Sequence, residues 1–474
     1  MENIRCYFSL IEPSLLQQIQ GKPSEFIAMV QEQHYISEDA FAQRICDKKH
    51  QKSYYRELKF RTLNVLQDLL LLSTQRGMNL IEKKFKKCQK KFLAGHILLN
   101  NGGRKEGVRL IKQAYDIAVE YDFTHLACEL SSILFHHYTY HNKNSQKAAH
   151  FERETNQFLR EYTVEKKTEQ HFNKVISAAH QSQKKIDVEK AIEKINQLNG
   201  KSIKHKVHKY TLIVMHRFNT GDYIQVIATC RAAYSEFRNI PGVYAAHNQF
   251  FLAKKGIAHI ALSQHKEANK CFKEAAPYAK KKSFNDYLLR FYQIINYLHA
   301  GDYQEAYTLF QRSKTCKHEL LQPQFLIIEA YLHFLKHCGY LQLDHIFRLG
   351  KYLNETFKAQ TDKRGDNVNI LIAELLILLT RDRGRFIDRI ESIQRYCYTY
   401  LQGQDTRRAR WFIKLLCKLP RANFNATDIQ RIARKEISNL AQFPICSGSN
   451  FAVEIIPFGQ LLPMVMAQLK AYRA

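Results

Sequence analysis

A short recurring phrase restricts the fold of this chain most: Gly221-Asp222-Tyr223 returns as Gly301-Asp302-Tyr303. Each copy lies between stretches in which apolar residues recur every three or four positions, the spacing of one helical face. Turn signals recur at intervals of 37 to 45 residues, near Gly102, Asn142, Lys184, Gly221, Gln264, Gly301, Gly339 and Gly384. Each interval accommodates two helices of about 15 residues with short connections, which is the unit of an α-solenoid.

The length of the chain agrees with a repeat architecture. A chain of 474 residues exceeds the size at which one compact core usually stops growing, about 250 to 300 residues. No segment shows sustained strict alternation of apolar and polar residues, so strands should be rare. The sequence therefore predicts an all-α fold, a right-handed α-solenoid of about seven to eight helix-turn-helix repeats with helical caps at both ends. The predicted domains are an N-terminal helical bundle or cap (1–80), the solenoid (81–405) and a C-terminal helical cap (406–474).

The segment from Leu252 to Ala275 resembles the tetratricopeptide repeat. Its small residues Gly256, Ala268 and Ala275 and its aromatic residue Phe272 match the family's pattern, in which small residues allow two helices to cross closely. Partial copies contain Gly95, Leu98, Gly107, Ile111 and Ala114, then Gly221 to Tyr223, then Gly301 to Ala306 with Phe310. The mean spacing of about 40 exceeds the 34 residues of that repeat. The chain thus resembles a divergent tetratricopeptide-like solenoid, most strongly over 205–315 and more weakly over 88–400.

The resemblance implies that the first helix of each repeat lines a concave groove. The residues implied for this groove are Phe92, His96, His208, Met215, Phe250, Ile257, Phe291, Ile295 and His299. They are largely apolar or aromatic, and the Lys, Asn and Arg set with which some members clamp a terminal carboxylate is not in place. Such a groove suits an amphipathic helix or an extended segment of a protein partner. Burial between neighbouring repeats is the alternative explanation of the same residues.

The charge of the chain is strongly positive, with 72 Lys and Arg against 44 Asp and Glu and a formal net charge of +28. Two lysine-rich helix faces stand out, Lys83, Lys84, Lys86, Lys87, Lys90 and Lys91 in one and Lys201, Lys204, Lys206 and Lys209 in the other. A positive field attracts nucleic acid, anionic lipid or an acidic protein. Solvated faces that maintain solubility explain the same lysines.

The N-terminal segment has two explanations. Ser37-Glu38-Asp39 is a good helix start, and a long helix with an apolar stripe should follow from Ser53 to about Leu72. These helices could cap the solenoid or form a helix-turn-helix that reads DNA. Residues 1–16 lack the features of a signal peptide, and the apolar stretch 370–379 is too short to cross a bilayer. The eleven cysteines include no C-x-x-C pair, so we expect reduced thiols and a soluble, cytoplasmic protein.

Catalytic and metal-binding patterns are missing from the sequence. His333 and His337 stand four residues apart, as do His137 and His141, but no third or fourth zinc ligand can be assigned. The glycine-rich turn 100–104 lacks the Lys-Ser/Thr ending of a phosphate-binding loop, and no nucleophile motif occurs. We expect no catalytic residues, no metal and no cofactor.

The sequence therefore predicts a non-enzymatic scaffold that binds a protein or peptide segment in its concave groove, with positive charge steering an acidic partner. Two alternatives stay open. One is a nucleic-acid-associated protein that uses the lysine-rich faces, with the N-terminal helix-turn-helix as a DNA reader. The other is a regulatory solenoid that senses a small peptide.

Overall fold

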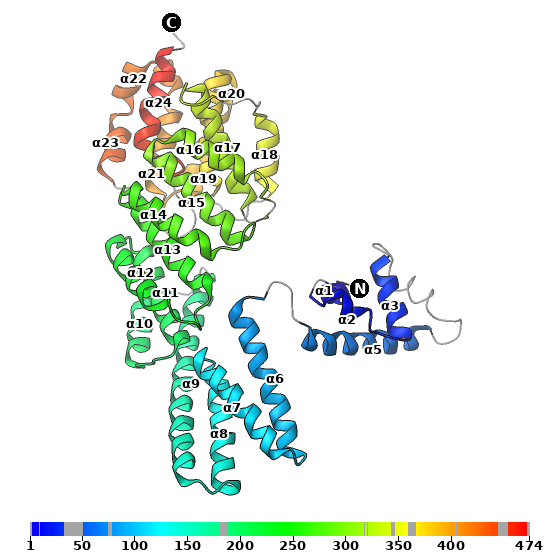
Figure 1. Ribbon diagram of the computed structural model, residues 1–474. Helices are drawn as coiled ribbons and strands as arrows, with labels where there is room; N and C mark the ends of the chain where they lie inside the picture. The colour runs from blue at the N-terminus through cyan, green and yellow to red at the C-terminus, as the bar shows by residue number, and fades with distance from the viewer. Residues whose placement is uncertain are drawn as a thin grey trace. The chain divides into compact units, whose positions relative to one another are not determined.

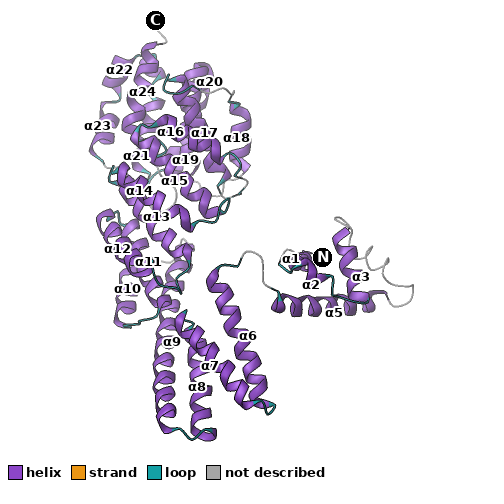
Figure 2. Cartoon of the chain, in the orientation of Figure 1, coloured by secondary structure: helices purple, strands orange, loops and turns teal. Residues whose placement is uncertain are grey.

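The computed structural model describes residues 2–8, 10–32, 51–73, 78–180, 187–316, 318–319, 321–342, 347–358, 366–403, 406–443 and 454–471. Within these ranges every regular element is helical and no strand occurs (Figure 2). The predicted all-α class is confirmed. The chain forms two compact units, Met1–Phe158 and Leu159–Ala474. The predicted three-part division at residues 80 and 405 stays a prediction, and Ser37–Asp39 and Lys184 lie outside the described residues.

The first unit begins with a small helical bundle, whose core includes Ile4, Phe26, Leu58 and Leu66. Its helices are α1 (Glu2–Phe8), α2 (Pro13–Leu16), α3 (Lys22–Glu32) and α5 (Gln51–Leu72). Then follow α6 (Leu80–Asn100), α7 (Arg104–Glu120), α8 (Thr124–His136), the π-helical turn η1 (His137–His141) and the start of α9 (Ser145–His180). Consecutive helices from α6 to α8 pack against each other.

Over its described residues, the second unit contains the remainder of α9 and the helices α10 to α24 (Figure 1). These are α10 (Val188–Gln197), α11 (Ile203–Asn219), α12 (Tyr223–Phe237), α13 (Ala245–Ala261), α14 (His265–Ala275), α15 (Phe284–Ala300), α16 (Tyr303–Ser313), α17 (Gln322–His337), α18 (Leu349–Lys358), α19 (Asp366–Arg381), α20 (Arg383–Tyr400), α21 (Arg407–Cys417), α22 (Ala426–Ile432), α23 (Arg434–Gln442) and α24 (Phe458–Ala471). Consecutive helices from α10 to α17 contact each other, and α13 also contacts α11 and α15 directly. The helices thus stack in sequence order, with alternate helices forming one row.

The recurring phrase makes the turn between two helices in both of its copies. Gly221 and Gly301 have φ angles of +78° and +83°, a conformation that glycine adopts without steric cost. The following aspartates are the N-cap residues of α12 and α16, and the Asp222 carboxylate accepts a hydrogen bond from the Gln225 amide at 3.2 Å. The turns predicted near Gly102, Asn142, Gln264 and Gly339 also lie between helices, whereas Gly384 falls in the first turn of α20.

The close helix crossing predicted at Gly256 is present. A Cβ atom placed there would stand 2.6 Å from Cε1 of Phe272, so α13 and α14 approach too closely for a larger residue. The first unit has a similar crossing of α6 and α7, where a Cβ atom on Gly107 would stand 2.9 Å from the Gly95 carbonyl oxygen. The small residues in the sequence are therefore packing positions.

The C-terminal helices share one hydrophobic core with α15 to α20. A buried ion pair joins Nε of Arg408 to Oε1 of Glu454 at 2.5 Å. The next residues, Ile455, Ile456 and Phe458, are buried as well. The segment from Glu454 onward is thus an integral part of this core. Among the described helices, none combines the length and apolar character that crossing a membrane requires.

Candidate functional site

A cavity of about 520 Å³ lies in the second unit, between α9, α11, α13 and α15. Its walls are mainly apolar and include Phe172 of α9, Phe250 of α13, and Leu288 and Tyr292 of α15. A concave, mostly apolar pocket of this size with a few polar groups is the usual form of a binding site. The cavity is therefore the candidate functional site.

The spacing of residues on α13 explains why this helix supplies much of the wall. His247, Phe250, Lys254 and Ile257 follow each other at three- and four-residue intervals, so they share one helix face. All four line the cavity. Phe251, which immediately follows Phe250, points to another face and is fully buried in the core. The helix thus uses one face for packing and another for the cavity.

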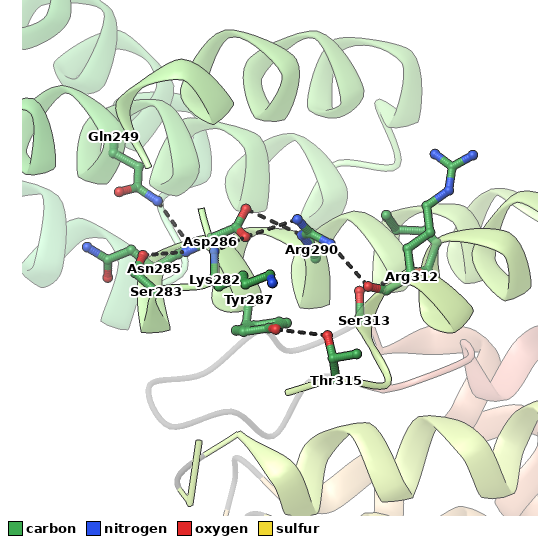
Figure 3. A network of polar contacts seen from close by, with 11 residues as sticks. Gln249, Lys282, Ser283, Asn285, Asp286, Tyr287, Arg290, Arg312, Ser313 and Thr315 are labelled. Atoms are coloured by element: carbon green, nitrogen blue, oxygen red, sulfur yellow. Dashed lines mark hydrogen bonds and ion pairs between the residues drawn. The ribbon is translucent and has the colours of Figure 1, made fainter. Parts of the chain in front are cut away.

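The rim of the cavity is fixed by a polar network at the start of α15 (Figure 3). Nε2 of Gln249 on α13 donates to the Asn285 carbonyl oxygen at 3.0 Å. The Asp286 carboxylate pairs with Arg290 at 3.0 Å, and Arg290 donates to the Arg312 carbonyl oxygen at 3.3 Å. These bonds join α13, α15 and the end of α16, so the rim is held in a defined shape before any ligand arrives.

A lysine lines this mainly apolar cavity. The ammonium group of Lys254 lies 4.6 Å from the ring centroid of Phe218, and burial lowers the pKa of Lys254 below its usual value. Among the described residues, no carboxylate forms an ion pair with it. A cation in apolar surroundings is expensive unless it is paired. Lys254 therefore marks the place where the cavity is best suited to receive a negative charge.

Two histidines with unsatisfied nitrogen atoms also line the cavity. The Nδ1 atoms of His208 and His247 are buried and have no hydrogen-bond partner among the described residues. Burial lowers the pKa of both side chains, that of His208 to about 4. The imidazole of His208 also packs against the Phe172 ring, with ring centroids 4.6 Å apart and ring planes tilted by 32°. At neutral pH His208 is therefore uncharged and available to hydrogen-bond a ligand.

The structure brings only part of the predicted groove together. His208, Phe250 and Ile257 line the cavity, whereas Met215 is half-buried elsewhere on α11. Phe92 and His96 lie on α6 in the first unit, with ring centroids 6.2 Å apart.

Three predicted groove residues lie in the core. Phe291, Ile295 and His299 are 1%, 0% and 4% exposed. His299 donates from Nε2 to the Glu454 carbonyl oxygen at 2.5 Å, and the Gln460 side chain donates to the His299 carbonyl oxygen at 2.7 Å. The placement of these three on an open face is corrected, because neighbouring parts of the chain cover them: Phe291 packs against Phe325 of α17, with ring centroids 6.3 Å apart, and the C-terminal segment contacts His299.

Sequence reasoning missed several cavity residues, although a usable signal was present. Phe172, His208, Phe250 and Leu288 stand 36, 42 and 38 residues apart in sequence. These intervals are close to the spacing of the turns, and residues at this spacing on α9, α11, α13 and α15 meet at the cavity. Lys254 had no such signal, because it is one of many lysines in a basic chain.

The first lysine-rich face is partly engaged within the chain. Nζ of Lys86 donates to the Leu70 carbonyl oxygen at 2.8 Å, and Nζ of Lys90 donates to the Leu72 carbonyl oxygen at 3.2 Å. Both lysines thus satisfy carbonyl groups at the end of α5, where positive charge also complements the helix dipole. Nζ of Lys91 donates to Gln113 at 2.5 Å. Lys84 lies over the Tyr121 ring, while Lys83 and Lys87 are exposed.

The second lysine-rich face is balanced in part by acidic residues. Lys204 pairs with Glu169 at 3.2 Å, and Lys206 pairs with Glu236 at 2.8 Å. Lys201 is exposed and Lys209 is half-buried. The two faces lie in different units. The contacts reduce the charge that is free to attract a polyanion.

The histidine pairs singled out by their spacing have other partners. His333 is buried with its ring centroid 5.0 Å from that of Phe347, and Nε2 of His337 accepts from Arg381 at 3.0 Å. His137 and His141 have ring centroids 6.1 Å apart. Across the described ranges, no group of three or more His, Cys, Asp or Glu side chains is placed to hold a metal ion.

Comparison with known proteins assigns the chain to no family. No family model matches the chain, and no curated protein matches it significantly.

Proposed function

We propose that the chain is a non-enzymatic, tetratricopeptide-like α-solenoid scaffold that binds a protein or peptide segment in the cavity between α9, α11, α13 and α15. The observation that carries the proposal is the meeting of His208, Phe250 and Ile257, on successive first helices, at one mainly apolar cavity. A cavity of about 520 Å³ can take apolar anchor side chains from a docked segment, as helix and strand grooves do. The proposal includes a cytoplasmic location, because scattered cysteines without a C-x-x-C pair are typical of reduced thiols.

Nucleic-acid binding is the weaker candidate. Its support is the net charge of +28, which attracts any anion. The ammonium groups of Lys86 and Lys90 donate to backbone carbonyls, and those of Lys204 and Lys206 pair with carboxylates, so these four groups are less available to phosphates. The test below therefore includes a nuclease arm.

A photo-activated cross-linking residue placed at Phe250 tests the proposal in cells. The matched control carries the same residue at Ile224, which is 69% exposed on the neighbouring helix α12. We expect a specific protein cross-link at position 250, none at position 224, and no effect of nuclease treatment. The partner found in this way is then purified, and its affinity for the scaffold is measured directly.

Blocking the cavity provides the second arm. Ala253 lines the cavity, so Ala253→Arg places a long side chain in it and should weaken binding of the purified partner at least tenfold. Ile224→Arg adds the same charge elsewhere and should leave the affinity unchanged. Equal cross-linking at both positions, loss of binding after nuclease treatment, or full affinity of Ala253→Arg would each reject the proposal.

A further inference from the structure

The position of Lys254 limits the kind of segment that the cavity can accept. Lys254 lines the cavity together with Phe172, Phe250, Leu288 and Tyr292, and its ammonium group lies 4.6 Å from the ring centroid of Phe218. A segment with only apolar groups would cover this cation without providing a counter-charge, which is unfavourable. A segment that brings a carboxylate would pair with it in surroundings of low polarity, where such a hydrogen-bonded pair is strong.

We propose that the segment bound in the cavity is acidic and apolar at once: an Asp or Glu side chain pairs with Lys254 while a neighbouring apolar side chain packs against Phe250 and Leu288. The inference rests on the proposed function and adds the chemistry of the partner. The free Nδ1 atoms of His208 and His247 hydrogen-bond main-chain groups of the same segment.

The C-terminal segment of the chain itself shows this kind of docking. The carboxylate of Glu454 pairs with Arg408 at 2.5 Å. The neighbouring side chain of Ile456 is buried, and the ring of Phe458 stacks on Phe412 with centroids 4.6 Å apart. The helices of this unit thus already bind one stretch in which a carboxylate stands beside apolar anchors and pairs with a guanidinium group.

The number of cations argues against a polyanion in the cavity. Lys254 is the one Lys or Arg among its lining residues, and the histidines beside it are neutral at physiological pH when their pKa values are lowered by burial. A nucleic-acid strand needs a series of cations along its backbone. One cation in an apolar wall instead matches one carboxylate on an apolar segment.

Selection from a library identifies the preferred segment without knowledge of the natural partner. The probe is a phage library in which random peptides are displayed internally, so that no free C-terminus is offered to the purified full-length protein. We expect wild-type protein to enrich sequences with Asp or Glu next to a large apolar residue. Lys254→Met should keep the apolar preference and lose the acidic one. Lys266→Met removes the same charge from an exposed site on α14 and should select as wild type does.

Synthetic peptides then measure how much the ion pair with Lys254 contributes to the affinity. The best sequence is made with both ends capped, once with Glu and once with Gln at the selected position. For wild-type protein we expect Glu→Gln to raise Kd at least tenfold, and for Lys254→Met we expect the two peptides to bind equally. Lys254→Arg should restore the preference for Glu. Helical circular dichroism on each variant verifies that it is folded.

The outcomes separate the two proposals. Enrichment of apolar peptides without an acidic preference, or equal binding of the Glu and Gln peptides by wild-type protein, overturns the acidic partner and leaves the scaffold function standing. If no peptide is enriched and position 250 cross-links to nothing, both the inference and the proposed function fail.

Discussion

The crossing of α13 and α14 gives a quantitative prediction for Gly256→Ala. The added Cβ atom would stand 2.6 Å from Cε1 and 2.9 Å from Cζ of Phe272, whereas carbon atoms pack best at about 3.5–4.0 Å. The Phe272 ring is fully buried, so it would have to move by about 1 Å within a filled core. Such overpacking costs about 1–3 kcal/mol.

Gly256→Ala also raises the helix propensity of the position, and a control must separate this stabilisation from the effect of the clash. Replacing glycine by alanine inside a helix stabilises it by up to about 1 kcal/mol. Gly350 on α18 supplies the control, because a Cβ atom added there meets nothing within 4 Å. Gly350→Ala therefore has the propensity gain without the clash. We expect Gly256→Ala to be less stable than Gly350→Ala by about 1–3 kcal/mol in free energy of unfolding.

Urea unfolding followed by helical circular dichroism measures both variants, which lie in the same compact unit. A third protein, Gly256→Ala with Phe272→Leu, removes the ring that the methyl group meets. A double-mutant cycle should show that the two changes together cost less than their sum. If Gly256→Ala is as stable as Gly350→Ala, or if the two changes are additive, the close crossing does not limit residue size at this position.

Three further predictions concern buried groups. Arg408→Met removes the ion-pair partner of the buried Glu454 carboxylate and should lower the free energy of unfolding by about 3–5 kcal/mol. Arg395→Met breaks an exposed pair with Glu391 and should change that free energy little. Equal losses of the two variants in urea titrations would contradict this prediction. Burial lowers the pKa of His299 from 6.5 to about 4, so between these values the unfolded chain binds more protons than the folded one and stability should fall on acidification, by up to about 1.4 kcal/mol per pH unit. His299→Gln should reduce that slope and exposed His96→Gln should not, as measured by urea unfolding from pH 7 to pH 4. Burial raises the pKa of the Cys230 thiol to about 12, so iodoacetamide should modify exposed Cys6 in the native protein and Cys230 only after unfolding. Peptide mass spectrometry detects both products. Early modification of Cys230 would show that this core opens readily.

Features set by local chemistry were predictable from the sequence. The turn at Gly301 needs a left-handed residue and a helix start directly after it, and Gly301-Asp302 supplies both within two positions. Gly256 and Phe272 stand sixteen residues apart, on two helices joined by a short turn, so their contact follows from one hairpin. Predictions of this kind depend on few residues, and the structure agrees with them.

Features set by distant segments were not predictable. The apolar spacing of Phe291, Ile295 and His299 identifies a helix face but not what covers it. The covering group for His299 is Glu454, which lies 155 residues later in the chain. Likewise, the spacing of Lys86 and Lys90 places them on the polar side of α6, but only the packed structure shows that the end of α5 meets them. Periodicity specifies the direction of a side chain, whereas its neighbour depends on the whole fold.

The predicted groove is a cavity at one end of α15 and is covered by the C-terminal segment at the other. The repeat spacing brings Phe172, His208, Phe250 and Leu288 to one cavity, and it would extend this row along α15 toward His299. There Glu454 and Gln460 contact His299. The chain itself thus covers the end of α15, whereas the cavity lies between α9 and the start of α15. Because Lys254 lines this cavity and no carboxylate among the described residues forms an ion pair with it, the search for a partner should begin at Lys254.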